Sequence, residues 1–340
     1  MIKRIALSGD FFDQTGAPVF PMFDLNPLKE RDDIELVIFE SVGEIRADQL
    51  RGVDALILLQ PKISTASLEG NHRLAMVARF GVGYDNVDVA ACSAAHVAVV
   101  ITPDGVRRPV AVSILTLMMA LTGNLMIKNR LTREGPERFA QRIDHMGFGL
   151  VGRTLGSVGI GNIGAEMFRL ARPLDMRFIA YDPYVDQKTA AELGVELVGL
   201  DDVFSRADVV AINCPLSEDT TRLVNAERLA LMKPTAYLIN TARGPIVDQA
   251  ALTETLTARR IAGAGLDVLE QEPPDPDDPI LKLDNVILTP HALCWTDQCF
   301  AGNGAADVQA VCDLIKGFVP RGIVNAAIVD DPVWREKLGS

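Results

Sequence analysis

Short apolar runs recur along the chain, separated by stretches whose spacing suits amphipathic helices. Before residue 103 the runs are RIALSG, IELVIFE, ALILLQ, AMVARFG and VAVVITP. Beyond residue 150 they are LGSVGIG, MRFIAYD, DVVAINCP, TAYLINT, IAGAGLDV and NVILTPH. Strands that alternate with helices are the units of a parallel sheet. The pattern therefore predicts an α/β protein with two doubly wound parallel-sheet domains.

The segment that joins the two blocks is unusually apolar. Residues 109–127 carry no charge, while Arg107 and Arg108 precede them and Lys128 follows. The length approaches that of a membrane span, but interspersed Ser, Thr, Gly and Asn residues favour a buried helix between domains or at a subunit interface. Residues 128–142 are charged and lack a strand pattern, which indicates an arm or a linker. Two blocks joined in this way suggest two domains with a cleft between them.

Composition excludes several classes of protein. Hydrophobic residues make up 48% and charged residues 23%, which is typical of a globular protein, and the net charge of −12 argues against a nucleic-acid partner. The five cysteines form no CxxC pair, which suits reduced thiols in the cytoplasm. Cys294 lies near His291, yet a small buried thiol is favoured over a nucleophile. The N-terminal apolar run is too short for a signal-peptide core. We predict a cytoplasmic protein with no metal site and no membrane partner.

A glycine motif opens the second block. GIGNIG at 159–164 follows the strand-like LGSV and precedes an amphipathic helix. Gly159 suits a tight turn, Gly161 a close approach to a pyrophosphate, and Gly164 close packing of helix on strand. The first amides of the helix would face the phosphates. This context predicts a dinucleotide-binding Rossmann domain.

An acidic residue ends the next strand-like run. Asp182 follows Gly159 by 182 − 159 = 23 residues, close to the spacing expected for the acid that binds the adenosine ribose. Its carboxylate would repel a 2′-phosphate, so the cofactor predicted is NAD and not NADP. The alternative is an aspartate that caps the turn at Asp-Pro.

Further candidate site residues follow strand-like runs. RFGVGYDNVD at 79–88 contains a Gly-Val-Gly turn whose amides can form a nest for a carboxylate, although alone it is equally an ordinary turn. Arg243, Glu272 and His291 each follow a run in the second block, so all three can gather at one crevice. Arg243 suits a carboxylate and a carbonyl, and His291 suits proton transfer, with Glu272 fixing its tautomer. A histidine after a strand is, by itself, more often structural.

Five ordered motifs resemble those of the D-isomer-specific 2-hydroxyacid dehydrogenases. They are GVGYDNVD, VGIGNIG, NTARGPIVD, AGLDVLEQEP and TPHA. The resemblance implies a flavodoxin-like substrate domain at 1–104 and 293–340 and an inserted NAD domain at 105–292. It also implies an interdomain cleft, and a homodimer formed through a helix and arm at about 106–150.

The resemblance also implies a role for individual residues. Arg243 would bind the substrate, Glu272 would pair with the histidine, and His291 would be the acid and base. Val82 and Gly83 would donate backbone hydrogen bonds to the substrate carboxylate. The implied cofactor contacts are Gly159, Gly161, Asn162, Ile163, Gly164, Asp182, Cys214, Pro215, Thr220, Thr241, Ala242 and Asp267.

The implied reaction is hydride transfer between NAD and a small 2-oxoacid or D-2-hydroxyacid. Leu58 and Leu59 stand where phosphoglycerate dehydrogenases of this family carry an arginine, although Arg107 and Arg108 could still supply positive charge. Glu272 argues against formate as the substrate, because formate dehydrogenases of this fold have glutamine there.

Other departures and alternatives leave the substrate and the class open. Val112-Ser113 and the segment Ala-Leu-Cys-Trp after His291 depart from the family pattern and leave the pocket undefined. Glyoxylate and hydroxypyruvate are plausible substrates. The alternatives to an enzyme are an NAD(H)-sensing scaffold like the co-repressors of this fold and a catalytically silent paralogue.

Overall fold

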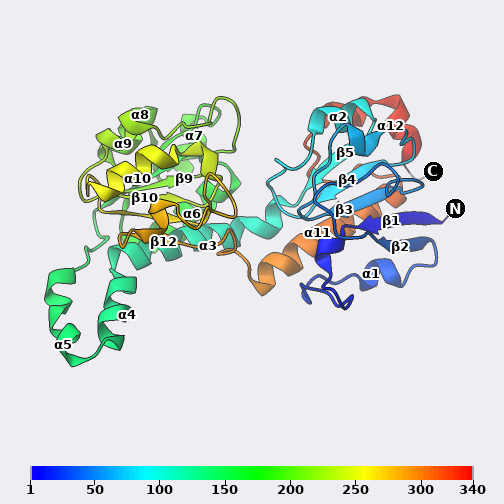
Figure 1. Ribbon diagram of the computed structural model, residues 1–340. Helices are drawn as coiled ribbons and strands as arrows, with labels where there is room; N and C mark the ends of the chain where they lie inside the picture. The colour runs from blue at the N-terminus through cyan, green and yellow to red at the C-terminus, as the bar shows by residue number, and fades with distance from the viewer. Residues whose placement is uncertain (1, 339–340) are drawn as a thin grey trace. The chain divides into compact units, whose positions relative to one another are not determined.

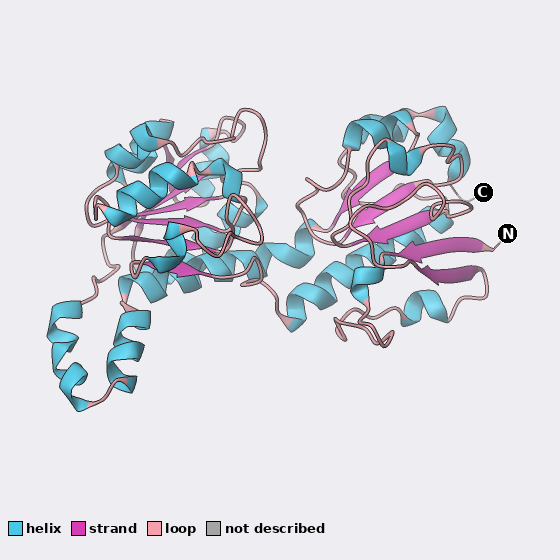
Figure 2. Ribbon diagram, in the orientation of Figure 1, coloured by secondary structure: helices cyan, strands magenta, loops and turns pink. Residues whose placement is uncertain are grey.

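The protein is built on two parallel sheets, seen in a computed structural model that describes residues 2–338 (Figures 1 and 2). The strands of the first sheet are β1 (Lys3–Leu7), β2 (Ile34–Ile38), β3 (Ala55–Leu58), β4 (Met76–Arg79) and β5 (Ala98–Ile101). The strands of the second are β6 (Thr154–Val158), β7 (Arg177–Tyr181), β8 (Val195–Leu197), β9 (Val209–Ile212), β10 (Tyr237–Asn240), β11 (Gly263–Leu266) and β12 (Val286–Leu288).

The order of the strands identifies both sheets. The five-stranded sheet runs β2-β1-β3-β4-β5, which is the flavodoxin-like order. The seven-stranded sheet runs β12-β11-β10-β9-β6-β7-β8, so its order reverses between β9 and β6, as in a dinucleotide-binding fold. Every pairing between these strands is parallel. The predicted α/β class with two parallel sheets is confirmed.

The chain divides into two compact units. The first contains the residues up to Val106 together with those from Trp295 onward, and the second is Arg107–Cys294. Each unit carries one of the sheets.

Helices bury both faces of the sheet in the first unit. Leu28 of one helix and Val308 and Val311 of another pack on one face, and Cys92 of a third packs on the other. Trp334 of the last helix is fully buried, and its Nε1–H donates to the Ala75 carbonyl at 2.8 Å. The helices are α1 (Asn26–Lys29), α2 (Val89–Ala94), α11 (Asp297–Ile315) and α12 (Pro332–Lys337).

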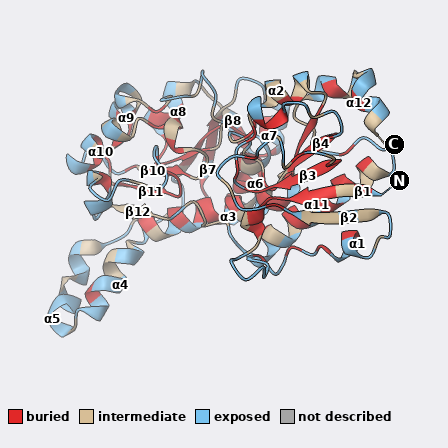
Figure 3. Ribbon diagram, turned by 45° about the vertical axis from the view of Figure 1, so that its right-hand side comes forward, coloured by how far each residue is buried: buried red, intermediate tan, exposed pale blue. Residues whose placement is uncertain are grey.

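The second sheet is likewise covered on both faces, and its strands are buried along most of their length (Figure 3). Two helices, through Ile114 and Phe168, pack on one face, and Phe204 and Leu252 of two others pack on the opposite face. Burial on both faces explains why the strands read as continuous apolar runs. The helices of this unit are α6 (Asn162–Ala171), α7 (Gln187–Glu192), α8 (Leu200–Arg206), α9 (Ala226–Leu231) and α10 (Gln249–Thr257).

The apolar segment before the second sheet forms the long helix α3 (Pro103–Thr122), which continues past the boundary at Val106. Among the described residues it is the one helix long and apolar enough to cross a membrane, but 67% of its apolar window is buried inside the protein. This burial favours a core helix. The expected helix through Ile127 is interrupted, because Asn124 adopts a left-handed conformation with φ of 52°.

The charged stretch that follows is helical. It forms α4 (Leu125–Arg133) and α5 (Pro136–Phe139), which project from the second sheet as a hairpin (Figure 1). Leu125, Met126 and Phe139 are exposed on it. The sequence left open whether this stretch is an arm or a linker, and its form is that of an arm.

Candidate active site

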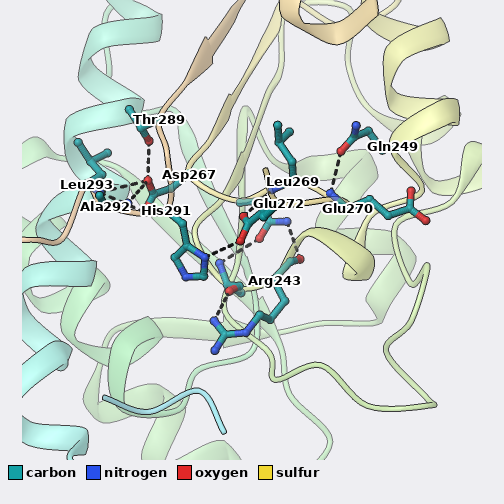
Figure 4. Close-up of polar contacts among 12 residues, drawn as sticks. Arg243, Gln249, Asp267, Leu269, Glu270, Glu272, Thr289, His291, Ala292 and Leu293 are labelled. Carbon is teal, nitrogen blue, oxygen red and sulfur yellow. Dashed lines mark hydrogen bonds and ion pairs between the residues drawn. The ribbon is translucent and has the colours of Figure 1, made fainter. Parts of the chain in front are cut away.

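Three adjacent strands deliver the principal side chains to one edge of the second sheet (Figure 4). Arg243 follows β10, Glu272 follows β11, and His291 follows β12. Because β12, β11 and β10 are neighbours and parallel, their carboxyl ends lie side by side. The structure therefore brings together the three residues that the sequence separates by up to 48 positions, since 291 − 243 = 48.

A glycine lets the arginine loop approach the glutamate loop closely. Arg243 precedes the 3₁₀ turn Gly244–Ile246. A Cβ atom on Gly244 would overlap the carbonyl of Leu269, so only glycine fits there. The Asn240 side chain donates to the Arg243 carbonyl at 2.8 Å and so connects the arginine loop to the end of β10. The backbone thereby fixes the base of the Arg243 side chain.

The imidazole of His291 is held by Glu272. Nδ1 of His291 lies 2.8 Å from Oε2 of Glu272, and the Leu269 N–H donates to Oε1 at 3.0 Å. Burial acts to raise the pKa of Glu272, but the hydrogen bond and charge of His291, the Leu269 amide and the charge of Arg243 together lower it below its ordinary value. An ionised carboxylate only accepts, so Nδ1 carries the hydrogen and Nε2 remains to exchange a proton with a ligand.

Both members of the pair remain accessible. The side chain of His291 is 43% exposed and that of Glu272 is 37% exposed. A small molecule can therefore reach the imidazole, which a purely structural histidine would not require.

Asp267 organises the loop that carries His291. Its Oδ1 accepts from the Thr289 hydroxyl at 2.6 Å and from the amides of Ala292 and Leu293 at 3.1 Å each. Its carbonyl accepts the His291 N–H at 2.8 Å. These bonds hold His291 at φ of 54°, a left-handed conformation that is uncommon outside glycine. The sequence predicted Asp267 only as a cofactor contact and did not predict that it orders the loop of His291.

The glycine motif has the shape that a dinucleotide needs. Gly159 has φ of 95°, and a Cβ there would lie 2.8 Å from the Asn213 carbonyl oxygen. A Cβ on Gly164 would lie 2.6 Å from the Gly159 carbonyl oxygen. At Gly161, by contrast, no described atom lies within 4 Å of an added Cβ, so the fold itself leaves this space open. No side chain of residues 2–338 caps α6, whose first amides face this space.

Asp182 stabilises the glycine loop through a hydrogen bond. Its Oδ2 accepts from the Ile160 amide and its Oδ1 from the Tyr184 amide, each at 2.9 Å. The turn-capping alternative is thus observed. It does not exclude ribose binding, because each carboxylate oxygen has a second lone pair.

The remaining cofactor candidates lie at the same edge of the sheet. Asn162 and Ile163 begin α6, Cys214 and Pro215 follow β9, and Thr241 and Ala242 follow β10. The buried Thr241 hydroxyl has no hydrogen-bond partner within residues 2–338, so a ligand would satisfy it. The Thr220 hydroxyl is used locally, because it donates to the Pro215 carbonyl at 2.7 Å. Burial raises the pKa of Cys214 to about 11, so its thiol stays protonated. The residues present fit a dinucleotide.

Two predicted contacts belong to the first unit. Val82 and Gly83 lie in the loop that follows β4, at the carboxyl edge of the five-stranded sheet. Among residues 2–338, no three His, Cys, Asp or Glu side chains are grouped to hold a metal ion.

Comparison with known proteins gives consistent matches. A family model described as the NAD-binding domain of the D-isomer-specific 2-hydroxyacid dehydrogenases matches residues 115–292. A glyoxylate reductase of Korarchaeum cryptofilum is 38% identical over 313 residues, which are 91% of this chain and 94% of the relative. A D-3-phosphoglycerate dehydrogenase of Archaeoglobus fulgidus is 34% identical over 80% of this chain. The chain spans about half of that relative's length, 51%.

Solved structures agree with these matches. D-lactate dehydrogenase of Escherichia coli is 28% identical, with a TM-score of 0.76 over 94% of this chain and 99% of its own. D-lactate dehydrogenase of Aquifex aeolicus, solved with NAD and lactic acid, is 26% identical, with a TM-score of 0.79 over 92% and 96% of the two chains.

The role of Asp267 can be tested through the His291 loop. Asp267→Ala removes the whole carboxyl group, so two amides and a hydroxyl lose their acceptor. We expect the free energy of local opening to fall by about 1–3 kcal/mol, with roughly ten- to hundredfold faster amide exchange at Ala292 and Leu293. Hydrogen–deuterium exchange of the peptide at 286–296 measures this. Thr289→Val, which removes a single bond, should give a smaller change, and unchanged exchange in Asp267→Ala would refute the assignment.

Proposed function

The chain belongs to the D-isomer-specific 2-hydroxyacid dehydrogenases, as its motifs predict, and we propose that it reduces a small, unphosphorylated 2-oxoacid with NADH. Residues 115–292 match the NAD-binding domain of this family. The observation that carries the proposal is the accessible His291–Glu272 pair, 2.8 Å apart, beside Arg243 at the edge of a dinucleotide-binding sheet. The reverse reaction is oxidation of a D-2-hydroxyacid.

The proposed roles follow from the chemistry of each group. The bound cofactor supplies the hydride. Arg243 holds the carboxylate and the keto oxygen, and its fixed charge stabilises the alkoxide that develops on that oxygen. His291 donates a proton from Nε2 to the oxygen, and the negative charge of Glu272 stabilises the imidazolium before the transfer. Val82 and Gly83 donate backbone hydrogen bonds to the substrate carboxylate.

The proposed cofactor contacts rest on the open space at Gly161, the uncapped start of α6 and the buried Thr241 hydroxyl. Asp182 supports NAD over NADP, because it directly follows β7, lies beside the glycine loop and has a carboxylate that would repel a 2′-phosphate.

Two buried leucines support an unphosphorylated substrate. Leu58 is fully buried and Leu59 is 8% exposed, so the position of the arginine expected in phosphoglycerate dehydrogenases is part of the core here. Of the relatives described above, the one matched over 94% of its length is named a glyoxylate reductase. Glyoxylate and hydroxypyruvate are therefore the first substrates to test, and Glu272 argues against formate.

We also propose a homodimer formed by α3 and the arm. Exposed apolar side chains are concentrated there, and large exposed apolar surfaces usually mark interfaces. They are Val112, Met119, Leu125, Met126, Phe139, Ile143, Met146 and Val151. A cytoplasmic location is supported by the five cysteines, none of which forms a disulfide within residues 2–338.

The alternative functions make a different prediction about turnover. A sensing scaffold or a silent paralogue would bind NADH without reducing any 2-oxoacid. The enzyme is favoured because Glu272 and Leu269 orient an imidazole that remains 43% exposed, an arrangement that binding of a dinucleotide alone does not require.

Loss of the imidazole should abolish turnover and spare cofactor binding. We expect His291→Ala to lower kcat by about 10²–10⁴-fold, because the proton donor is lost, while the Kd for NADH stays unchanged. The assay is the loss of NADH absorbance with glyoxylate, hydroxypyruvate or pyruvate, together with fluorescence titration of NADH. His72→Ala, at an exposed histidine elsewhere, is the matched control. Wild-type turnover in His291→Ala would refute the catalytic role.

Cofactor preference should depend on Asp182. Asp182→Ala removes the charge that repels a 2′-phosphate, so the preference for NADH over NADPH should fall by at least about tenfold in kcat/KM. Asp186→Ala, which removes the aspartate that caps the neighbouring α7, controls for a general loss of charge. An unchanged cofactor ratio in Asp182→Ala would count against the ribose contact.

The oligomeric state tests the arm. We expect the wild-type chain of 36.8 kDa to elute as a dimer in size-exclusion chromatography with light scattering. Ile143 is 74% exposed in the single chain. Ile143→Lys should shift the protein toward the monomer, because a charge would be buried at the dimer interface. Phe318→Lys, at an exposed site in the first unit, should not. A monomeric wild-type chain would refute the proposed dimer.

A further inference from the structure

Helix α11 carries polar residues on the face that packs into the first unit. Phe300, Asn303 and Asp307 have the spacing of one helical face, and Phe300 stacks on Phe80 with ring centroids 5.8 Å apart. Asn303 is 3% exposed and Asp307 is fully buried. Burying polar groups costs free energy unless they are paired, so this face calls for an explanation. All three residues face the carboxyl ends of β4 and β5.

Asn303 is connected to the loop Gly81–Val82–Gly83 through one threonine. The Thr102 hydroxyl donates to Oδ1 of Asn303 at 2.9 Å. The same hydroxyl accepts the Gly81 N–H at 2.8 Å, and the Thr102 amide donates to the Gly81 carbonyl at 2.9 Å. Gly81 is therefore fixed on both its N–H and its carbonyl, and α11 supports this arrangement from within the core.

Arg79 lies directly against the same loop. It is the last residue of β4, and its Nη1 donates to the carbonyl of Phe80. A Cβ on Gly81 would lie only 2.6 Å from that Nη1, and Gly81 has φ of 123°. The guanidinium thus occupies the place where a side chain at position 81 would stand. The position of the Arg79 guanidinium and the conformation of the loop at Gly81 are therefore coupled.

Asp307 is an acid fully buried in the first unit, and the charge of Arg79 acts on its carboxyl group. It lies one helical turn after Asn303 on α11. Burial raises the pKa of Asp307 well above its ordinary value, and the charge of Arg79 opposes that rise. Within residues 2–338 neither carboxyl oxygen has a hydrogen-bond partner, so its interaction with Arg79 is its evident contribution.

We propose that Asn303 and Asp307 are positioning residues for the substrate carboxylate. Asn303 acts through Thr102 and Asp307 acts through Arg79, and together they hold the loop so that the Val82 and Gly83 amides are preorganised for an anion. The inference rests on the proposed function, in which those amides bind the carboxylate of the 2-oxoacid. Preorganisation lowers the ordering cost of binding, so loosening this support weakens substrate binding and leaves cofactor binding unaffected.

The test replaces the buried acid with a residue of similar size. Asp307→Leu should raise the KM for the 2-oxoacid by about tenfold and leave the Kd for NADH unchanged. Its melting temperature should hold or rise, because replacing a buried acid by a packed apolar group is often neutral or stabilising. Asp307→Asn keeps a polar side chain of the same size near Arg79 and should recover most of the loss. A merely structural residue would not separate KM from the melting temperature in this way.

Two further variants provide an independent test and a control. Thr102→Val removes the hydroxyl that links Asn303 to Gly81 but keeps the shape of the side chain, so it should also raise the KM, and it applies even if Asp307→Leu does not fold. Asp54→Asn removes a buried carboxylate that pairs with Arg73 at the opposite, amino end of the same sheet. It should lower stability without changing the KM.

The outcomes separate the inference from the proposed function. Binding of oxamate, an unreactive 2-oxoacid analogue, to the NADH complex is measured by calorimetry alongside the KM. If the wild-type protein binds NADH but neither binds oxamate nor reduces a 2-oxoacid, the proposed function fails and the inference falls with it. If the wild-type protein does both, and Asp307→Leu and Thr102→Val match it in KM and oxamate affinity, only the positioning role is refuted. A joint rise in KM and in the NADH Kd with a lower melting temperature would also refute it.

Discussion

The candidate active site depends on the buried carboxylate of Asp267. This residue is 3% exposed, and its backbone and side chain connect the ends of three strands. Its amide donates to the carbonyl of Asn240, the last residue of β10, its carbonyl accepts from His291, and its carboxylate accepts from the loop after β12. A buried charge is tolerated only when it is so fully hydrogen-bonded. The same bonds that satisfy Asp267 set the backbone of His291.

In both units, buried polar side chains form hydrogen bonds to a loop at the carboxyl edge of the sheet. In the second unit a buried acid orders the loop that carries His291. In the first, Thr102 and the polar face of α11 order the loop that contains Val82 and Gly83. Loops at strand ends are otherwise the mobile part of an α/β fold, and a chemical site needs them fixed to within a fraction of an ångström. Buried polar side chains supply that rigidity without occupying the space that a ligand requires.

The sequence predicted the elements whose signals are local. The apolar runs in the sequence coincide with nearly all the strands, because strands buried on both faces consist mostly of apolar residues. The short edge strand β8 was not identified, since three residues carry too little pattern, and the helix break at Asn124 depends on one left-handed residue. The convergence of Arg243, Glu272 and His291 was predictable because parallel strands end at one edge. The role of Asp267 was not, because it depends on contacts between distant segments.

The charge at the start of α3 bears on the substrate. Arg107 and Arg108 could in principle attract a phosphorylated substrate, but Arg108 forms an ion pair with Glu166 of α6, which is 8% exposed. Burial acts to raise the pKa of Glu166, yet the hydrogen bond and charge of Arg108, with Arg169 and Arg107, lower it, so the acid stays ionised. Arg108 and Arg169 both form ion pairs with this acid and together compensate its charge. The charge of Arg108 is thus used to join α3 to α6, which supports the proposal of an unphosphorylated 2-oxoacid as the substrate.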